Sequence, residues 1–181
     1  MAIKPTIYKF KIALSDLNRD VYDLLNLTVA QHPSESTERM MTRLLAYCLN
    51  WQEFLSFTKG LSDIDEPAIW AKSLDDQILL WIDVGEPSED RVKKATRQAK
   101  QTKVYSFNIK SDVWWEQGKA KFQKLNAEYY RMDKQQINNL AKMVERTMDI
   151  SVTISEQSAY VATAKGECEV SWENIFVNEN T

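Results

Sequence analysis

Hydrophobic and polar positions alternate near the start of the chain and predict a β-hairpin. Residues 7–14 alternate between apolar and polar side chains, and residues 21–31 follow as a second strand after a polar turn. Alternation of this kind is typical of strands with one buried face. It places Lys9 and Lys11 on the face opposite Phe10.

The spacing of apolar residues then changes to that of a helix. Met41, Leu44, Leu45 and Cys48 recur on one helical face, and the preceding segment HPSEST supplies the proline, acid and hydroxyl residues that often precede a helix. The pattern predicts a helix that ends near Trp51.

In the middle of the chain, strand and helix patterns alternate. Residues 78–84, ILLWIDV, are a nearly continuous apolar run, typical of a strand buried on both faces. Residues 88–101 begin with a hydroxyl cap and acids and end with bases, which predicts a helix with a complemented dipole. Further strands are expected at 65–71, 103–109, 127–132, 148–155, 158–164 and 167–176, and further helices at 111–125 and 133–148. This order predicts an α/β fold with a central mixed sheet, helices on its faces and flanking antiparallel hairpins.

Composition narrows the class of protein. The 181 residues are 44% hydrophobic and contain no repeat or Pro/Gly linker, so we expect one domain over residues 1–181. No segment approaches the roughly 20 apolar residues of a membrane helix, and no secretory signal is visible, so we expect a cytoplasmic protein without a membrane partner. Two cysteines without metal-site spacing support neither a disulfide framework nor a zinc site. A net charge of −3 argues against indiscriminate coating of nucleic acid.

Two carboxylates occupy positions where a charge is costly. Glu38 precedes Met41 by three residues and Leu45 by seven, which places it on the apolar stripe of its helix. An acid near a helix start is also favoured by the dipole, so a capping or ion-pairing role stays open. Asp83 interrupts an apolar run at the carboxyl end of its strand, where α/β sheets bind ligands. It therefore needs a cationic partner or a metal.

The helix predicted after Asp83 is basic, unlike the chain as a whole. Its helical phase places an inner row beside the apolar stripe, from which side chains could reach Asp83: Arg91, Lys94 and Gln98. An outer row points toward water: Lys93, Arg97 and Lys100. The outer row is compatible with a solvated face or with a surface that contacts phosphates.

Several blocks in order along nearly the whole chain resemble the YaeQ family of bacterial proteins. They are HPSESTERMMTRLLA at 32–46, FTKGL and DEPAIW within 57–70, LLWIDVGEPSEDRVKKA at 79–95, and Trp114-Trp115. The resemblance implies the restriction-endonuclease-like fold of that family and the PD-(D/E)xK arrangement of a helix acid, two strand acids and a lysine.

Carried over by residue, the resemblance implies Glu38 as the helix acid, Asp65 or Glu66 as the first strand acid and Asp83 as the second. These acids would hold Mg²⁺ or Mn²⁺ for phosphodiester hydrolysis. Two departures stand out. Gly85 occupies the motif lysine position, and Glu66-Pro67 inverts the order of the Pro-Asp pair. The lysine would then come from the following helix, as Lys94 or, second, Lys93.

Three functions remain open. The first is a metal-dependent nuclease or phosphodiesterase acting on DNA or RNA, for which the acids should converge. The second is a non-catalytic module that binds nucleic acid or protein, with phosphate contacts from the basic helix: Arg91, Lys93, Arg97 and Gln98. The third is a structural interaction protein, whose acids should pair internally with bases such as Arg39 or Lys59.

Overall fold

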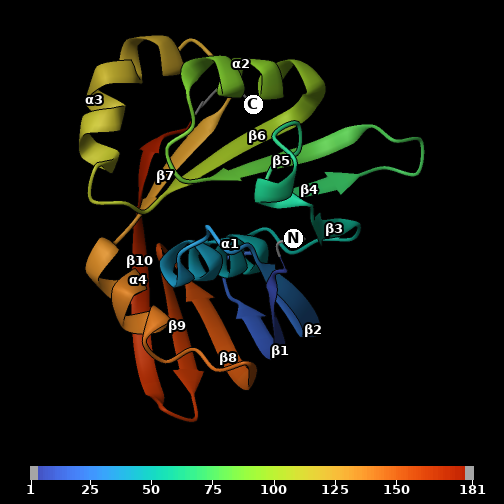
Figure 1. The fold of residues 1–181 in the computed structure, drawn as a ribbon, viewed down its shortest axis with the longest axis vertical. Helices are drawn as coiled ribbons and strands as arrows, with labels where there is room; N and C mark the ends of the chain where they lie inside the picture. Colours follow the sequence, from blue (N-terminus) through green and yellow to red (C-terminus); the bar gives the residue numbers. More distant parts are fainter. Residues whose placement is uncertain (1–3, 178–181) are drawn as a thin grey trace.

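One long sheet curls around a central helix (Figure 1). The computed structural model describes residues 4–177. Its ten strands follow the order β2-β1-β8-β9-β10-β7-β6-β5-β4-β3, and the sheet is mostly antiparallel, because only the β1–β8, β5–β6 and β6–β7 pairs are parallel. The strands are β1 (Thr6–Asp16), β2 (Val21–Gln31), β3 (Leu55–Phe57), β4 (Ile69–Lys72), β5 (Ile78–Val84), β6 (Ala99–Ser106), β7 (Glu128–Met132), β8 (Thr147–Ser155), β9 (Ser158–Thr163) and β10 (Gly166–Phe176). The helices are α1 (Thr37–Leu49), the 3-10 turn η1 (Gly60–Ser62), α2 (Glu89–Gln98), α3 (Ser111–Phe122) and α4 (Lys134–Ala141).

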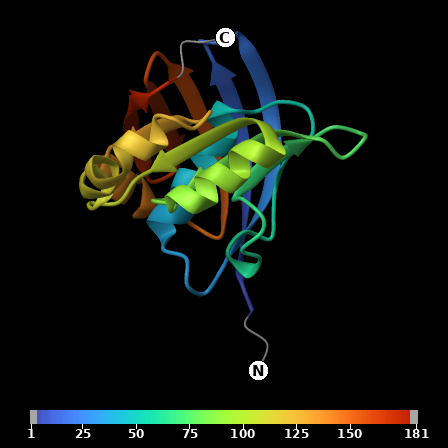
Figure 2. The same ribbon diagram turned by 90° about the horizontal axis from the view of Figure 1, so that it is seen from above.

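Strand β10 joins the two halves of the sheet. Its first half pairs with β9 and its second half pairs with β7, so the strand runs from the lower half of Figure 1 into the upper half. The two halves face each other across α1, and the sheet approaches a closed barrel without completing it. Figure 2 shows the curl from above, with α2 and α3 on the outer face of the upper half.

Helix α1 lies at the centre of the main hydrophobic core. Its residues from Met40 to Cys48 are all buried. A helix that is buried all round must be covered on several sides, and here both halves of the sheet and α4 supply the cover. The predicted helix is confirmed, and Ser36 caps it by accepting a hydrogen bond from the backbone N–H of Arg39.

The predicted hairpin is also confirmed. Strands β1 and β2 pair over eleven residues each, from Thr6 opposite Gln31 to Asp16 opposite Val21. Phe10 is buried, whereas Lys9 and Lys11 are exposed, as the alternation predicts.

Three predicted helices are too long, among them α3, which ends at Phe122 rather than at residue 125. Helix α2 ends at Gln98 and strand β6 begins at Ala99, so Lys100 lies on a strand rather than on the basic helix. Pairing with β5 from Ile78 opposite Ala99 draws this segment into the sheet, because tertiary hydrogen bonds override local helix preference. Helix α4 likewise ends at Ala141 rather than near residue 148.

The expected mixed α/β class is confirmed, with helices on both faces of the sheet and antiparallel hairpins beside the parallel strands. What the sequence did not predict is the closure of the sheet around α1. Among the described helices, none combines the length and apolar character needed to cross a membrane. Both cysteines are free thiols, with Cys48 in the core and Cys168 half-buried beside it.

Candidate functional site

Asp83 is a buried carboxylate near the end of β5. It is 4% exposed, and the strand alternation directs it away from α1. Leu80, Ile82 and Val84 face the core around α1, while Asp83 points to the opposite face, where α2 begins. The buried charge predicted from the sequence is therefore present, and its surroundings decide what it can do.

The partner of Asp83 is Arg91, on the first turns of α2. The guanidinium donates from Nε to Oδ2 at 3.0 Å and from Nη2 to Oδ1 at 3.1 Å. Arg91 also donates to the backbone carbonyls of Ile64 at 2.6 Å and Glu66 at 2.9 Å. The inner-row prediction is thus confirmed for Arg91. Both oxygens of Asp83 are used, and the charge is neutralised by a bidentate pair.

A pocket of about 230 Å³ lies beside this pair. Glu66 and Asp83 both line it, because Ile69 opposite Ile82 aligns the end of β5 with the segment that leads into β4. Arg39 and Arg91 also line the pocket. The two carboxylates that the sequence placed on neighbouring strands are thus brought to one cavity.

The carboxylates of this pocket nevertheless point to protein donors. Glu66 Oε2 accepts from the backbone N–H of Lys59 at 2.8 Å, and Glu86 accepts two hydrogen bonds from Asn108. Within residues 4–177, no group of three or more His, Cys, Asp or Glu side chains is arranged to hold a metal ion. In this arrangement the residues do not fit a resident Mg²⁺, because the oxygens of Asp83 are taken by Arg91.

Glu38 does not take the place that the sequence predicted. Its side chain is half-exposed, is not among those lining the Asp83 pocket, and makes no hydrogen bond or ion pair with any described residue. Helix α1 covers the face of β5 opposite to Asp83, and the helix residue that reaches the pocket is a base, Arg39. The expectation that Glu38 lies on the buried stripe of α1 is therefore wrong; it lies in the first turn, where the helix dipole favours an acid.

The remaining predicted residues of α2 lie on its exposed side. Lys94 forms an ion pair with Asp65 at 3.0 Å, and both side chains are more than half exposed. Lys93, Arg97 and Gln98 are exposed and have no side-chain partner among the described residues. The inner-row prediction is wrong for Gln98, which is exposed at the end of α2, and Lys94 reaches Asp65 rather than Asp83.

Comparison with known proteins places this architecture in a family. A family model described as YaeQ protein matches residues 1–172. The chain belongs to the YaeQ family. The YaeQ proteins of Salmonella typhi and Escherichia coli K12 are each 38% identical to it, over 94% of this chain and 95% and 96% of their own lengths.

Solved structures of YaeQ proteins agree with this assignment. The crystal structure from Pseudomonas syringae has a TM-score of 0.91 at 38% identity and covers 96% of this chain and 97% of its own. The structure from Xanthomonas axonopodis pv. citri has a TM-score of 0.93 at 30% identity, with 96% and 99% covered. The resemblance seen in the sequence blocks is thereby confirmed at the level of the YaeQ family.

The sequence reading missed a buried acid of this YaeQ-family chain, Glu35. It precedes the cap of α1, is 6% exposed and forms ion pairs with Arg39 and Arg43, the latter at 2.7 Å. Burial lowers the pKa of Arg43, while the charge of Glu35 opposes that shift. The sequence contained a signal for this acid. Arg43 lies within the run of buried positions on α1, and a buried arginine requires an acidic partner.

Lys103 is a partly buried lysine on the face of the sheet opposite to Asp83. Lys103, on β6, donates to Asn50 Oδ1 at 2.8 Å and lies 3.8 Å from Glu128. Burial lowers its pKa, and Glu128 opposes this. Lys103 lies opposite Ile82, on the α1 face of the sheet, so it cannot serve Asp83 as the motif lysine.

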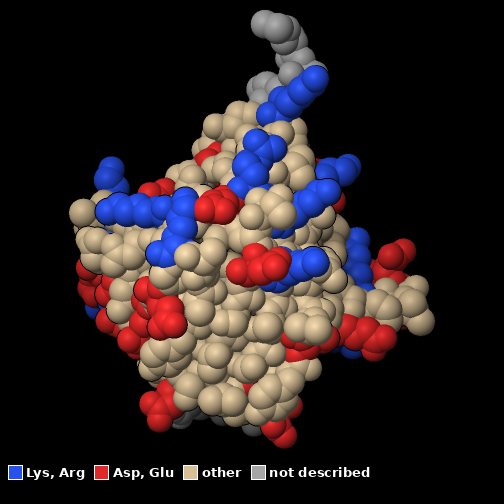
Figure 3. Space-filling view, turned by 90° about the horizontal axis from the view of Figure 1, so that it is seen from below, with Lys and Arg blue, Asp and Glu red and all other residues tan. Residues whose placement is uncertain are grey.

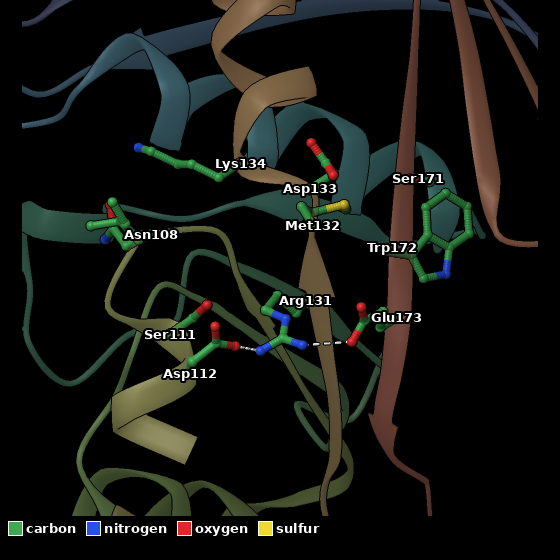
Figure 4. Close-up of a pocket in the computed structure, with 11 residues that line it drawn as sticks. Asn108, Ser111, Asp112, Arg131, Met132, Asp133, Lys134, Ser171, Trp172 and Glu173 are labelled. Atoms are coloured by element: carbon green, nitrogen blue, oxygen red, sulfur yellow. Dashed lines mark hydrogen bonds and ion pairs between the residues drawn. The ribbon is translucent and has the colours of Figure 1, made fainter. Parts of the chain in front are cut away.

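Another pocket of the YaeQ-family fold, of about 360 Å³, lies between the starts of α3 and α4 (Figure 4). Its central cation, Arg131, lies between Asp112 and Glu173 and is paired with both. The nearby Asp133 caps α4 by accepting from the backbone N–H of Gln136. Lys134 also lines the pocket, and its ammonium lies over the ring of Phe107 at 5.9 Å without an acid partner among the described residues. The other charges of this pocket are satisfied internally, so it offers less than the Asp83 region.

Charge is unevenly distributed over the surface. On the face seen from below, basic side chains gather toward the amino-terminal end, and acidic ones lie mainly away from it (Figure 3). The net charge of −3 thus hides local basic regions. Only these regions would attract a phosphate-bearing partner electrostatically.

Proposed function

We propose that this YaeQ-family protein is a nucleic-acid-binding module on a variant of the restriction-endonuclease-like scaffold. The observation that carries the proposal is the bidentate pair of Asp83 and Arg91. It neutralises the carboxylate on which metal-dependent hydrolysis would depend. It also ties α2 to the loop before β4, through the carbonyls of Ile64 and Glu66.

The exposed side of α2 supplies the contacts. Because Arg91 and Lys94 are paired with Asp83 and Asp65, the cations of α2 left for a ligand are Lys93 and Arg97, with Gln98 as a neutral donor. Arg91 ties the first turns of α2 to Asp83 and to the loop before β4, and the exposed side of the helix presents Lys93 and Arg97 to a phosphate backbone. Phosphate contacts of this kind give binding that weakens as the salt concentration rises, because binding releases counterions from the phosphates.

The test is the salt dependence of binding to labelled DNA and RNA, single- and double-stranded, measured by fluorescence anisotropy. The slope of log K against log salt is negative, and the Lys93→Gln/Arg97→Gln variant should reduce its magnitude by roughly 0.7–0.9 for each lost contact. A control, Lys110→Gln/Lys124→Gln, removes the same charge from exposed positions outside α2. Equal slopes for both variants, or no binding by the native protein, would overturn the proposal.

A second candidate, metal-dependent hydrolysis, is supported by the placement in one pocket of Asp83, on β5, and Glu66, in the loop before the neighbouring strand β4. For Asp83 to bind Mg²⁺ or Mn²⁺, Arg91 would have to leave it. Arg91 is 33% exposed and therefore has room to move. The helix acid Glu38 of the implied arrangement lies outside this pocket.

Cleavage of plasmid, single-stranded DNA and RNA with Mg²⁺ or Mn²⁺ tests this candidate. Metal-dependent cleavage by the native protein that is lost in Asp83→Ala, purified identically, would establish hydrolysis and displace the binding module as the function. Absence of cleavage with retained salt-sensitive binding supports the binding module. Equal cleavage by both proteins would identify a contaminant and count against hydrolysis.

A further inference from the structure

A second cavity near α1, of about 700 Å³, is basic although the protein is acidic. It is lined by the amino-terminal part of α1, the end of β2 and the segment around η1. Three cations, Arg39, Arg43 and Lys59, line it together with one carboxylate, Glu35. Its net formal charge is therefore +2, whereas the whole chain carries −3. We call this cavity the α1 pocket.

The cations of the α1 pocket retain hydrogen-bond donors. Arg43 uses Nε and Nη2 for Glu35 and the carbonyl of Ala30, which leaves Nη1 without a partner among the described residues. Arg39 commits only Nη1 of its guanidinium, to Glu35. The ammonium of Lys59 has no partner within residues 4–177. One carboxylate thus orients two guanidinium groups without exhausting them.

The orientation of these groups is built into the fold. Arg43 is 6% exposed, is anchored to Glu35 and Ala30, and lies over the ring of Phe57 at 5.2 Å. Arg39 is 17% exposed on the same helix, one turn earlier. Preorganised guanidinium groups favour ligands with several anionic oxygens, phosphate above all, because the planar fork matches their geometry.

We propose that the α1 pocket binds a phosphate monoester group. A monoester carries about −1.5 to −2 charges at neutral pH, which matches the +2 of the pocket better than the single charge of a phosphodiester. Arg39, Gly60 and Leu61 line both this pocket and the Asp83 pocket, so the two cavities adjoin. We assign this phosphate to the end of a nucleic-acid strand, and this assignment rests on the nucleic-acid-binding function proposed above.

Isothermal titration calorimetry in phosphate-free buffer without divalent metals tests the proposal. The probes are inorganic phosphate, the thymidine dinucleotide TpT and its 5′-phosphorylated form pTpT. The native protein should bind phosphate and pTpT saturably, and Arg39→Gln and Lys59→Gln should each weaken binding by tenfold or more. Lys59 is exposed, so its replacement should leave the fold intact. Lys59→Gln therefore still tests the proposal if Arg39→Gln fails to fold.

Lys124→Gln is the matched control, because it removes an exposed cation far along the chain from the α1 pocket. Equal weakening by this control, or no saturable binding of phosphate or pTpT, would overturn the proposal. Preference for pTpT over both TpT and phosphate supports a strand end. Phosphate binding as tight as that of pTpT supports the pocket with a small phosphorylated ligand. Phosphate binding without salt-sensitive binding to long DNA or RNA would refute the proposed nucleic-acid-binding function and leave the phosphate site of the α1 pocket standing.

Discussion

Individual arginines decide what the buried carboxylates of this protein can do. Asp83 and Glu35 are both nearly inaccessible, and each is held by guanidinium groups. A buried ion pair offers little net stability over an apolar pair, but removal of one partner leaves an uncompensated charge. The stability of each site should therefore depend strongly on both members being present.

Glu35 and Glu38 provide a direct comparison of a buried and a half-exposed acid at the start of α1. Glu35→Gln should reduce the free energy of unfolding by about 3 kcal/mol, because the buried Arg43 loses its counter-charge. Glu38→Gln should cost less than about 1 kcal/mol, since it loses only its interaction with the helix dipole. Urea denaturation of both variants checks this, and the opposite order of effects would contradict the assignment of Glu35 as the buried acid.

Arg91 and Lys94 permit the same comparison on α2. Arg91→Met keeps the aliphatic stem but leaves Asp83 unpaired, so we expect a loss of about 3 kcal/mol in the free energy of unfolding. Lys94→Met removes an exposed pair with Asp65, which contributes about 0–1 kcal/mol. Urea denaturation of the two variants, measured side by side, checks this. An equal loss of stability in both would contradict the role of the Arg91–Asp83 pair in stabilising the fold.

Among the elements, α3 is held to the sheet by aromatic packing. Trp114, Trp115 and Phe122 from this helix gather with Tyr129 of β7 in a second, smaller core. Trp115 and Phe122 stack at 5.9 Å between ring centroids. Both tryptophans therefore serve core packing, and Trp114 also donates from Nε1 to the carbonyl of Pro87.

Gly118 of α3 leaves space for the ring of Phe122. A Cβ at this position would lie 2.3 Å from Phe122 Cε2, so the ring would have to shift within its cluster. Alanine normally improves a helix by about 1 kcal/mol over glycine, while overpacking costs about 1–3 kcal/mol. We expect Gly118→Ala to lose about 1 kcal/mol in urea denaturation and to alter tryptophan fluorescence. Gln117→Ala, exposed on the same helix, is the control, and a stabilised Gly118→Ala would show that the ring moves freely.

At the scale of the whole molecule, the curled sheet buries tyrosines whose hydroxyl groups must stay neutral. Burial raises the pKa of Tyr47 to about 12 and raises the pKa values of Tyr105, Tyr129 and Tyr130 further. In the unfolded chain these groups ionise near 10.0. Above that pH the folded state therefore binds more protons than the unfolded chain. The contribution of these tyrosines to the free energy of unfolding is fully present below about pH 10 and is lost as the pH rises.

The expected result is a fall in the urea midpoint between about pH 10 and 12, with a slope of up to about 1.4 kcal/mol per pH unit for each buried tyrosine. Lys103 acts in the opposite direction below 10.5, because its lowered pKa makes the folded state bind fewer protons. Tyr47→Phe should reduce the alkaline loss, although it removes a hydrogen bond from its hydroxyl to Leu55 O. A stability that is unchanged up to pH 12 would contradict the burial of these hydroxyl groups.

The sequence by itself determined most elements of this protein and the presence of a charge in β5. The hairpin of β1 and β2, the capped helix α1 and the apolar strand β5 each follow from periodicity and local caps, which act over a few residues. The blocks around these elements also identified the YaeQ family. Helix ends were predicted less well, because Ala99 to Ser106 carries no local break and joins the sheet only by pairing with β5.

Only the tertiary structure decided which charges meet. Arg91 reaches Asp83 eight residues away and also the carbonyl of Ile64, 27 residues away, because α2 folds back over the end of the sheet. Glu35 rather than Glu38 is the buried acid, because the chain turns before the cap of α1 and directs Glu35 toward Arg43. Periodicity assigns a side chain to a face of its own element, but its partner depends on how distant segments cross, and the curl of the sheet sets those crossings.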